Sequence, residues 1–145
     1  MSEAGRFSID LLLSHGYVLA DDPHEREIMM PYPSLGILYL SSYLKERGFG
    51  VEIHDSTFST LAGFRQHLES CRPRVVGLSC NLLTRGNILR MVGWSREAGA
   101  TVVLGQCGVG EFDAVRVVQP RGQVGERARA VLQGAHVGPR ATLVV

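Results

Sequence analysis

The chain lacks the features that mark several large classes of protein. Its 145 residues carry 15 basic and 14 acidic side chains, so no excess of one charge favours nucleic acid or an anionic membrane surface. No apolar run approaches the roughly 20 residues that cross a bilayer. The first residues include Glu3 and Asp10 and show no basic start followed by an apolar block, unlike a signal peptide. We therefore expect a cytoplasmic protein that binds neither nucleic acid nor membrane.

Cysteine is scarce and widely spaced. Cys71, Cys80 and Cys107 are an odd number and lie nine and twenty-seven positions apart. No pair or trio of them is close enough in sequence to predict a zinc site or an iron–sulfur cluster. We expect unpaired thiols in a reducing compartment, and we predict no metal site.

Sequence signatures of catalysis are also missing. We identify no Ser–His–Asp arrangement, no Walker-type phosphate loop and no paired metal-ligand histidines. His54 and Asp55 are neighbours on one expected strand, so they point to opposite faces and make a poor acid–base pair. We predict no catalytic residue and expect no enzyme activity from the chain by itself.

What the chain does contain is a regular alternation of strand and helix signals over its first hundred residues. Its length and 45% hydrophobic content suit a single domain with a real core. The expected strands cover 7–13, 51–55, 75–78 and 101–104, and the expected helices run from the cap Ser34 to Gly48, from Ser59 or Thr60 to Pro73, and from the cap Thr84 to Gly99. Strands joined by helical crossovers pair in parallel with right-handed connections. The predicted fold is α/β, a Rossmann-like, flavodoxin-type doubly wound parallel sheet in a single domain.

Two segments fit this alternation less well. Residues 17–33 form a long polar connection, which in a compact domain is usually functional or mobile. After Gly105 the signals weaken: 106–110 resembles a loop, 112–118 a short strand or the start of a helix, 125–133 a helix and 141–145 a last strand. We therefore divide the domain into a core, 1–105, and a divergent C-terminal segment, 106–145, with loose packing over 106–140. Divergence, truncation and a shift of reading frame are all compatible with this change.

Small residues end two of the expected strands. The run Val-Val-Gly-Leu-Ser-Cys-Asn-Leu at 75–82 contains Ser79, and Thr-Val-Val-Leu-Gly-Gln at 101–106 contains Gly105. Ligands of open α/β sheets lie at the carboxyl ends of the strands, so both turns would face one crevice. Gly105 lets another group approach the backbone closely, and Ser79 offers a hydroxyl without bulk. A serine that bonds to its own backbone is the alternative for Ser79.

Together with Pro-Tyr-Pro-Ser-Leu-Gly at 31–36, these turns resemble the N-terminal cobalamin (vitamin B12) binding domain of B12-dependent radical-SAM proteins. The resemblance runs from about Leu11 to Gly105. It implies that the serine and glycine turns line the pocket for the nucleotide tail and that 31–36 opens the first helix beside the corrin ring. The cofactor-binding residues that it implies are Tyr32, Pro33, Leu35, Gly36, Ser79, Cys80, Asn81, Leu82, Gly105 and Gln106. Residues 55–58 also resemble a turn of these domains, with an Asx-type turn as the alternative.

The chain departs from cobalamin domains at two places. None of its five histidines lies in the Asp-x-His-x-x-Gly element that supplies a cobalt ligand in mutases and methionine synthase. This agrees with the radical-SAM type and implies a corrinoid held without a histidine of this chain; His15, at a strand end, is the one ligand candidate that we keep. The second departure is Gly105-Gln106-Cys107, where the family usually has a second glycine and then proline. Gln106 adds bulk where the tail would pass.

The resemblance therefore implies a cobalamin-binding module whose partner is a radical-SAM domain or protein. Parent enzymes of this family are methyltransferases or radical enzymes, and this chain lacks the three close cysteines that hold their cluster. Two other interpretations stay open, a flavin- or phosphate-binding module of the flavodoxin or response-regulator type and an inert truncated fragment. A phospho-acceptor site would need acidic residues at the end of the first strand, and Asp21 lies eight residues beyond Leu13. Ser14-His15-Gly16 is a short match to a flavin phosphate loop.

Overall fold

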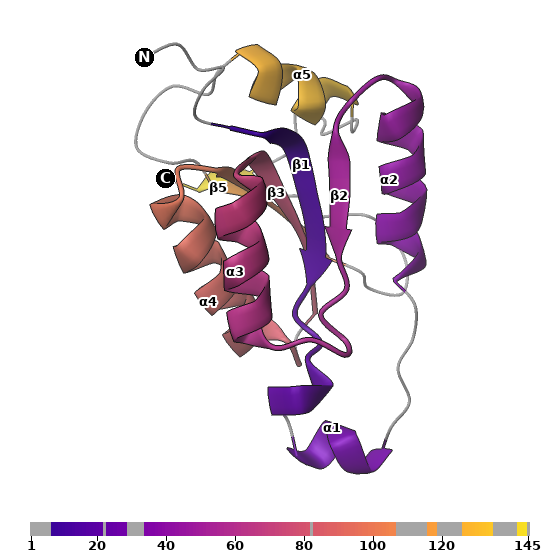
Figure 1. Cartoon of the computed structure of the whole chain (residues 1–145), viewed down its shortest axis with the longest axis vertical. Coiled ribbons are helices and arrows are strands. Elements are labelled where there is room, and N and C mark those ends of the chain that lie inside the picture. The colour runs from indigo at the N-terminus through magenta and orange to yellow at the C-terminus, as the bar shows by residue number, and fades with distance from the viewer. Residues whose placement is uncertain are drawn as a thin grey trace.

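The computed structural model describes residues 7–21, 23–28, 34–81, 83–106, 116–118, 126–134 and 142–144. Its elements in chain order are β1 (Ile9–His15), the 3-10 turn η2 (Leu19–Asp21), α1 (Pro23–Ile28), α2 (Leu35–Glu46), β2 (Val51–His54), α3 (Leu61–Cys71), β3 (Pro73–Cys80), α4 (Arg85–Glu97), β4 (Thr101–Gln106), β5 (Arg116–Val118), α5 (Glu126–Gly134) and β6 (Thr142–Val144) (Figure 1). No helix of these described segments is long and apolar enough to span a membrane.

The strands form one six-stranded sheet in the order β2-β1-β3-β4-β5-β6. β2, β1, β3 and β4 are mutually parallel, so their carboxyl ends lie at one edge. This parallel part and its helices confirm the predicted α/β, Rossmann-like, flavodoxin-type domain. β5, however, runs antiparallel to β4, and β6 pairs in parallel with β5, so the complete sheet is mixed. Only residues 107–115 separate β4 from β5, fewer than the dozen or so that a parallel crossover needs.

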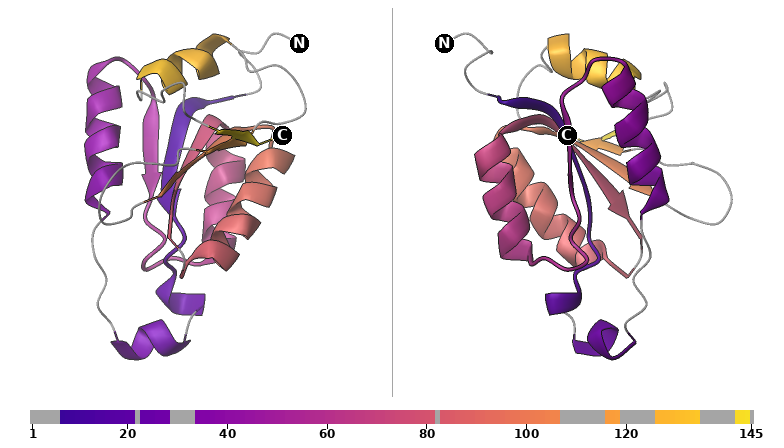
Figure 2. Two further views of the ribbon diagram at one scale, coloured as in Figure 1. Left: turned by 180° about the vertical axis from the view of Figure 1, so that it is seen from behind. Right: turned by 45° about the vertical axis from the view of Figure 1, so that its right-hand side comes forward.

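Helices cover both faces of the sheet (Figure 2). α3 and α4 pack on one face, where Leu12 and Val76 join Phe64 of α3 in a buried cluster. α2 packs on the other face, where Leu11 and Val75 belong to a second cluster. Neighbouring strand residues point to opposite faces, so Leu11 and Leu12 enter different clusters. The result is a three-layer domain with a hydrophobic core on each side of the sheet.

The helix ends follow the sequence signals in part. Thr60 caps α3 by accepting a hydrogen bond from the Gly63 amide at 2.9 Å. Gly48 and Gly99 take positive φ angles of 81° and 80° just after α2 and α4, which confirms both expected stops. Ser34, expected to cap α2, makes no side-chain cap hydrogen bond. The same holds for Thr84 at α4, whose hydroxyl is used within the preceding turn.

The described part of the connection expected over 17–33 contains two short helical elements, η2 and α1, which its polar sequence does not predict. Leu19 is buried, and its amide donates to the Thr57 carbonyl at 3.2 Å. Asp21 Oδ2 accepts a hydrogen bond from the Leu61 amide at 3.1 Å, at the start of α3. A carboxylate is favourable at a helix amino terminus, so the segment is tied to the turn between β2 and α3.

Part of the C-terminal segment packs against the core, which differs from the expected loose packing over 106–140. α5 lies within the expected helix 125–133 to one residue, and its Val131 is 1% exposed and belongs to the cluster under α2. Within 112–118, expected to be a strand or the start of a helix, residues Arg116–Val118 form the strand β5. Within the last strand expected at 141–145, residues Thr142–Val144 form β6. Gln106, the first position of the loop expected at 106–110, is instead the last residue of β4, because its backbone pairs with Cys80 of β3, and 107–110 lie outside the described residues.

Candidate functional site

The carboxyl ends of the parallel strands place one row of residues across the sheet. Strand register pairs His15 of β1 with Ser79 of β3, and Ser79 with Gly105 of β4. Asp55 directly follows β2, and its Oδ1 lies 3.0 Å from His15 Nε2. We call Asp55, His15, Ser79 and Gly105 the strand-end row. It brings Ser79 and Gly105 together, as the sequence suggests, and adds His15 and Asp55.

The strand-end row lies at the topological switch point of the sheet. β1 is followed by α2 on one face, whereas β3 is followed by α4 on the other. Connections that leave in opposite directions open a crevice outside the strand ends, and this is where doubly wound sheets bind ligands. His15 and Ser79, which belong to β1 and β3, lie on the two strands that flank this point.

Two contacts fix the His15 ring. Its Nδ1 accepts a hydrogen bond from the Tyr17 amide at 3.3 Å. In the neutral ring Nε2 then carries the proton and donates to Asp55 Oδ1. Both ring nitrogens are therefore engaged, so His15, the one ligand candidate from the sequence, presents no free nitrogen to a metal in this arrangement.

Asp55 closes the end of β2. Its Oδ1 also accepts the Thr57 amide at 3.0 Å, so residues 55–57 form the Asx-type turn that was the alternative for this segment. Burial raises the pKa of Asp55, but hydrogen bonds from Thr57 and His15 outweigh it and hold the pKa below its usual value. Beneath this turn, the buried Ser14 hydroxyl donates to the His54 carbonyl at 2.8 Å. Asp55 is thus a fixed carboxylate on a rigid strand end.

Ser79 and Cys80 lie on opposite faces of the sheet. Ser79 shares a face with Val75, which belongs to the cluster under α2. Cys80 packs instead against the cluster under α3 and α4, and burial raises the pKa of its thiol. The sequence-based set treats both as lining one pocket, yet side-chain alternation along β3 separates them.

The remaining candidates divide into described and undescribed positions. Asn81 is exposed, but its side chain holds the turn before α4, because its Oδ1 accepts a hydrogen bond from the Thr84 backbone amide at 2.9 Å. The backbone amide of Asn81 in turn donates to Thr84 Oγ1 at 3.2 Å. Gln106 is the last residue of β4, and its backbone pairs in register with Cys80. Tyr32, Pro33 and Leu82 lie outside the described residues.

Gly105 in the strand-end row and Gly36 in the first turn of α2 both have room for a side chain among the described residues. A methyl group built onto either glycine would meet no atom of those residues within 4 Å. α2 runs back along the sheet, so its first turn lies at the same edge as the strand carboxyl ends (Figure 1). On that helix Leu35, Leu38 and Tyr39 are exposed at positions i, i+3 and i+4, on the side opposite the buried Ile37, Ser41 and Leu44, so they face solvent rather than the sheet. We call these three residues the apolar stripe.

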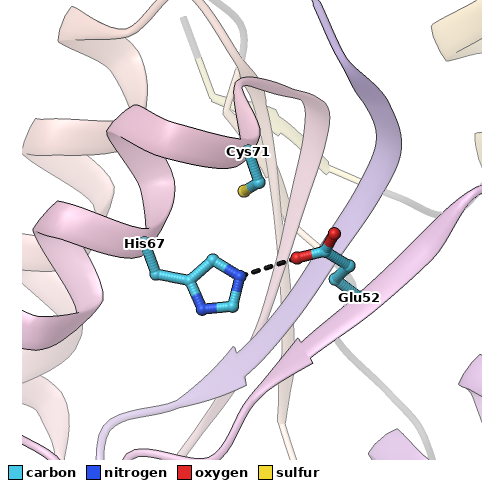
Figure 3. Close-up of side chains that lie close together, drawn as sticks. All are labelled: Glu52, His67 and Cys71. Carbon is cyan, nitrogen blue, oxygen red and sulfur yellow. Dashed lines mark hydrogen bonds and ion pairs between the residues drawn. The ribbon is translucent and has the colours of Figure 1, made fainter.

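A second group of polar side chains lies between β2 and α3, away from the row (Figure 3). Glu52, His67 and Cys71 place one possible ligand atom each within 4.8 Å of one another. Sequence spacing alone missed this group because Glu52 comes from another element. The spacing of His67 and Cys71, four residues apart on a helix, is the only part that the sequence signals.

Neither a protein-family model nor a curated protein sequence matches this chain.

Proposed function

We propose that the chain is a cobalamin-binding module, not catalytic by itself, that holds the corrinoid over the carboxyl edge of its parallel strands. The observation that carries this proposal is the register of Ser79 with Gly105 beside the switch point. A large macrocycle with a long nucleotide tail needs strand ends with little bulk. The side chains of Ser79 and Gly105, a hydroxymethyl group and a hydrogen atom, meet that need. The space around Gly105 among the described residues would also admit part of the ligand.

The apolar stripe lies at the end of α2 that reaches this edge of the sheet (Figure 1). Leu35 begins α2 and is exposed together with Leu38 and Tyr39 on the solvent side of the helix, so a corrinoid that covers the stripe would extend beyond the strand ends and around the start of α2. Clustered exposed apolar side chains on a small domain are a common mark of a binding surface. Burial of such surface yields about 25 cal/mol per Å², so covering the stripe would add to corrinoid affinity.

The proposal includes a corrinoid bound without a histidine ligand from this chain. His15 is the only histidine in the strand-end row, and its two ring nitrogens are already engaged by Tyr17 and Asp55. A radical-SAM domain or protein is the proposed partner, because the segments 31–36, 75–82 and 101–106 resemble a domain that accompanies one. Cys71 and Cys80 are unpaired thiols, which supports a cytoplasmic location.

The turn after β1 does not favour the flavin or phosphate alternative. A phosphate cradle needs open backbone amides at this turn. A methyl group built onto Gly16 would lie 2.9 Å from atoms of Thr84 and Ile88, so this glycine permits close packing against α4. The Gly16 carbonyl also accepts a hydrogen bond from Asn87 at 2.9 Å. The turn is thus closed by protein contacts.

The test is an absorption spectrum. Purified chain is incubated with excess hydroxocobalamin, desalted and scanned, with bovine serum albumin treated identically as the control. We expect corrin bands to co-elute with the protein at about one corrinoid per chain. A colourless protein with a folded far-ultraviolet circular dichroism spectrum would contradict the proposal, and a yellow flavin spectrum before any addition would favour the alternative.

A further inference from the structure

We propose that Glu52, His67 and Cys71 form a zinc-binding site between β2 and α3, separate from the strand-end row. Their ligand atoms lie within 4.8 Å of one another, with His67 Nε2 at 2.7 Å from Glu52 Oε2. Figure 3 shows the His67 ring turned toward the Glu52 carboxylate, with Cys71 further along the same helix. Thiolate sulfur, imidazole nitrogen and carboxylate oxygen are the ligand types that Zn²⁺ takes in proteins.

Local structure explains why these side chains converge. His67 and Cys71 are four residues apart on α3 and so project from the same side of the helix. On β2, Val51 belongs to the cluster under α2, and the next residue, Glu52, points to the opposite face. That face is the one covered by α3, as the edge-on contact between His54 and Phe64 at 5.6 Å confirms. The site is therefore built on a strand and a helix rather than on loops.

The charges of the three ligands match a divalent cation. One thiolate and one carboxylate carry two negative charges between them, so a bound Zn²⁺ would leave the site neutral. Neutrality matters because Cys71 is only 7% exposed, and a buried unpaired charge is costly. Burial and the nearby Glu52 raise the pKa of the Cys71 thiol to about 11. Metal binding would displace that proton to solvent as the zinc–sulfur bond forms.

Exposure gives the ion a route to the site. The Glu52 and His67 side chains are 46% and 29% exposed, whereas Cys71 lies at the inner end. Three protein ligands leave one position of a tetrahedral ion, which water can fill from the solvent side. The site thus combines a fixed, buried sulfur with two ligands that an incoming ion can reach.

His54 supplies the support that metal-binding histidines commonly have. Its Nδ1 lies 3.2 Å from His67 Nδ1. A metal on His67 Nε2 leaves the ring proton on Nδ1, which can then donate to His54 Nδ1. His54 Nε2 is buried and has no hydrogen-bond partner among the described residues, so no contact there prevents its Nδ1 from accepting. His54 is therefore a positioning residue for the proposed site.

Cobalt is the spectroscopic probe for this site. The full chain, reduced and metal-free, is titrated with Co²⁺ while the thiolate-to-cobalt charge-transfer band is followed in the near ultraviolet. We expect the band to saturate at about one equivalent and to bleach when Zn²⁺ displaces the cobalt. Cys71→Ser should abolish the band, whereas the matched variants Cys80→Ser and Cys107→Ser should keep it.

Three further variants test the remaining residues and guard against misfolding. Glu52→Gln and His67→Gln change half-exposed side chains and should weaken Co²⁺ binding by at least about tenfold. His54→Phe removes the acceptor behind His67 and should weaken it by about tenfold or more. Should Cys71→Ser fail to fold, these variants, with Cys71 in place, decide the question. Unchanged affinity in both glutamine variants, or a band that depends on Cys80 or Cys107, would overturn the site, and neither result bears on corrinoid binding.

Discussion

At the scale of single residues, the strand-end row combines fixed polar groups with open small ones. His15 and Asp55 bond to each other and to the backbone of the turns after β1 and β2, which fixes their side chains at the strand ends. Ser79 and Gly105 present little side-chain volume on the neighbouring strands. The proposed nucleotide tail needs small side chains at both Ser79 and Gly105, which are paired in the sheet. A larger side chain at Ser79 should therefore lower corrinoid affinity.

Ser79→Tyr should weaken corrinoid binding while leaving the fold intact. Ser79 lies at a strand end and is only partly buried, so the ring can extend beyond the strand ends instead of into the core. Steric overlap of this kind costs about 1–3 kcal/mol, and about 1.4 kcal/mol corresponds to a tenfold loss of affinity. We expect hydroxocobalamin affinity, measured by spectrophotometric titration, to fall by about tenfold or more.

The matched control for that change is Leu89→Tyr. Leu89 is exposed on α4, on the opposite face of the sheet from Ser79, so it adds the same ring far from the crevice. This control should bind as the parent does. Equal affinities of the parent and Ser79→Tyr would show that the ligand does not pass over the end of β3.

At the scale of elements, the helices and parallel strands were largely predictable because their signals are local. Gly48 and Gly99 end helices, and Thr60 begins one, through backbone conformation and a cap bond that neighbouring residues determine. The order within 17–33 was missed because it depends on Leu19 and Asp21 reaching the turn after β2, contacts about forty residues away in sequence.

The limits of prediction are similar for the candidate sites. The proximity of Ser79 and Gly105 was predictable, since both end strands of one parallel sheet. The proximity of Glu52, His67 and Cys71 was not predictable, because the approach of Glu52 to His67 depends on how α3 packs across β2. The docking of α5 was missed for the same kind of reason, since its contacts, such as that of Arg127 with Asp10 and the burial of Val131 in the cluster under α2, join segments far apart in sequence.

That contact gives a prediction at the element scale. Arg127 donates two hydrogen bonds to the buried Asp10, from Nε to Oδ1 at 2.9 Å and from Nη2 to Oδ2 at 3.0 Å. Hydrogen bonds to charged groups contribute more than neutral ones, and Arg127 is half exposed, so we expect Arg127→Ala to lower the free energy of unfolding by about 1–2 kcal/mol at pH 7. Urea unfolding measures this, and Arg129→Ala on the same helix is the control that should change little.

The same pair predicts a dependence on pH. The hydrogen bond from Arg127 lowers the pKa of Asp10, burial opposes it, and the Gly50 amide adds to the lowering. A carboxyl whose pKa is lower in the folded protein stabilises the fold above its unfolded pKa of about 4, and this contribution is lost as the pH falls through the folded pKa. The difference between parent and Arg127→Ala should therefore shrink below about pH 4. A difference that stays constant there would show that the contribution of Arg127 does not depend on the charge of Asp10.

At the scale of the whole molecule, the two proposed sites and the docked helix occupy different parts of one three-layer domain. The strand-end row lies at the carboxyl edge of the sheet, and α5 lies at the opposite end, near the start of β1 (Figure 1). The proposed zinc-binding site of Glu52, His67 and Cys71 lies between β2 and α3, on the face opposite α2.

The measurement that tests the central claim most directly is amide chemical-shift mapping with hydroxocobalamin. Spectra of ¹⁵N-labelled chain are compared before and after saturation, because amides that contact the ligand shift most. We predict that the largest changes fall at Leu35, Gly36, Ser79 and Gly105, with small changes in α5. Unchanged spectra, or changes centred on α5 or on the face covered by α3 and α4, would contradict a corrinoid bound over the strand-end row.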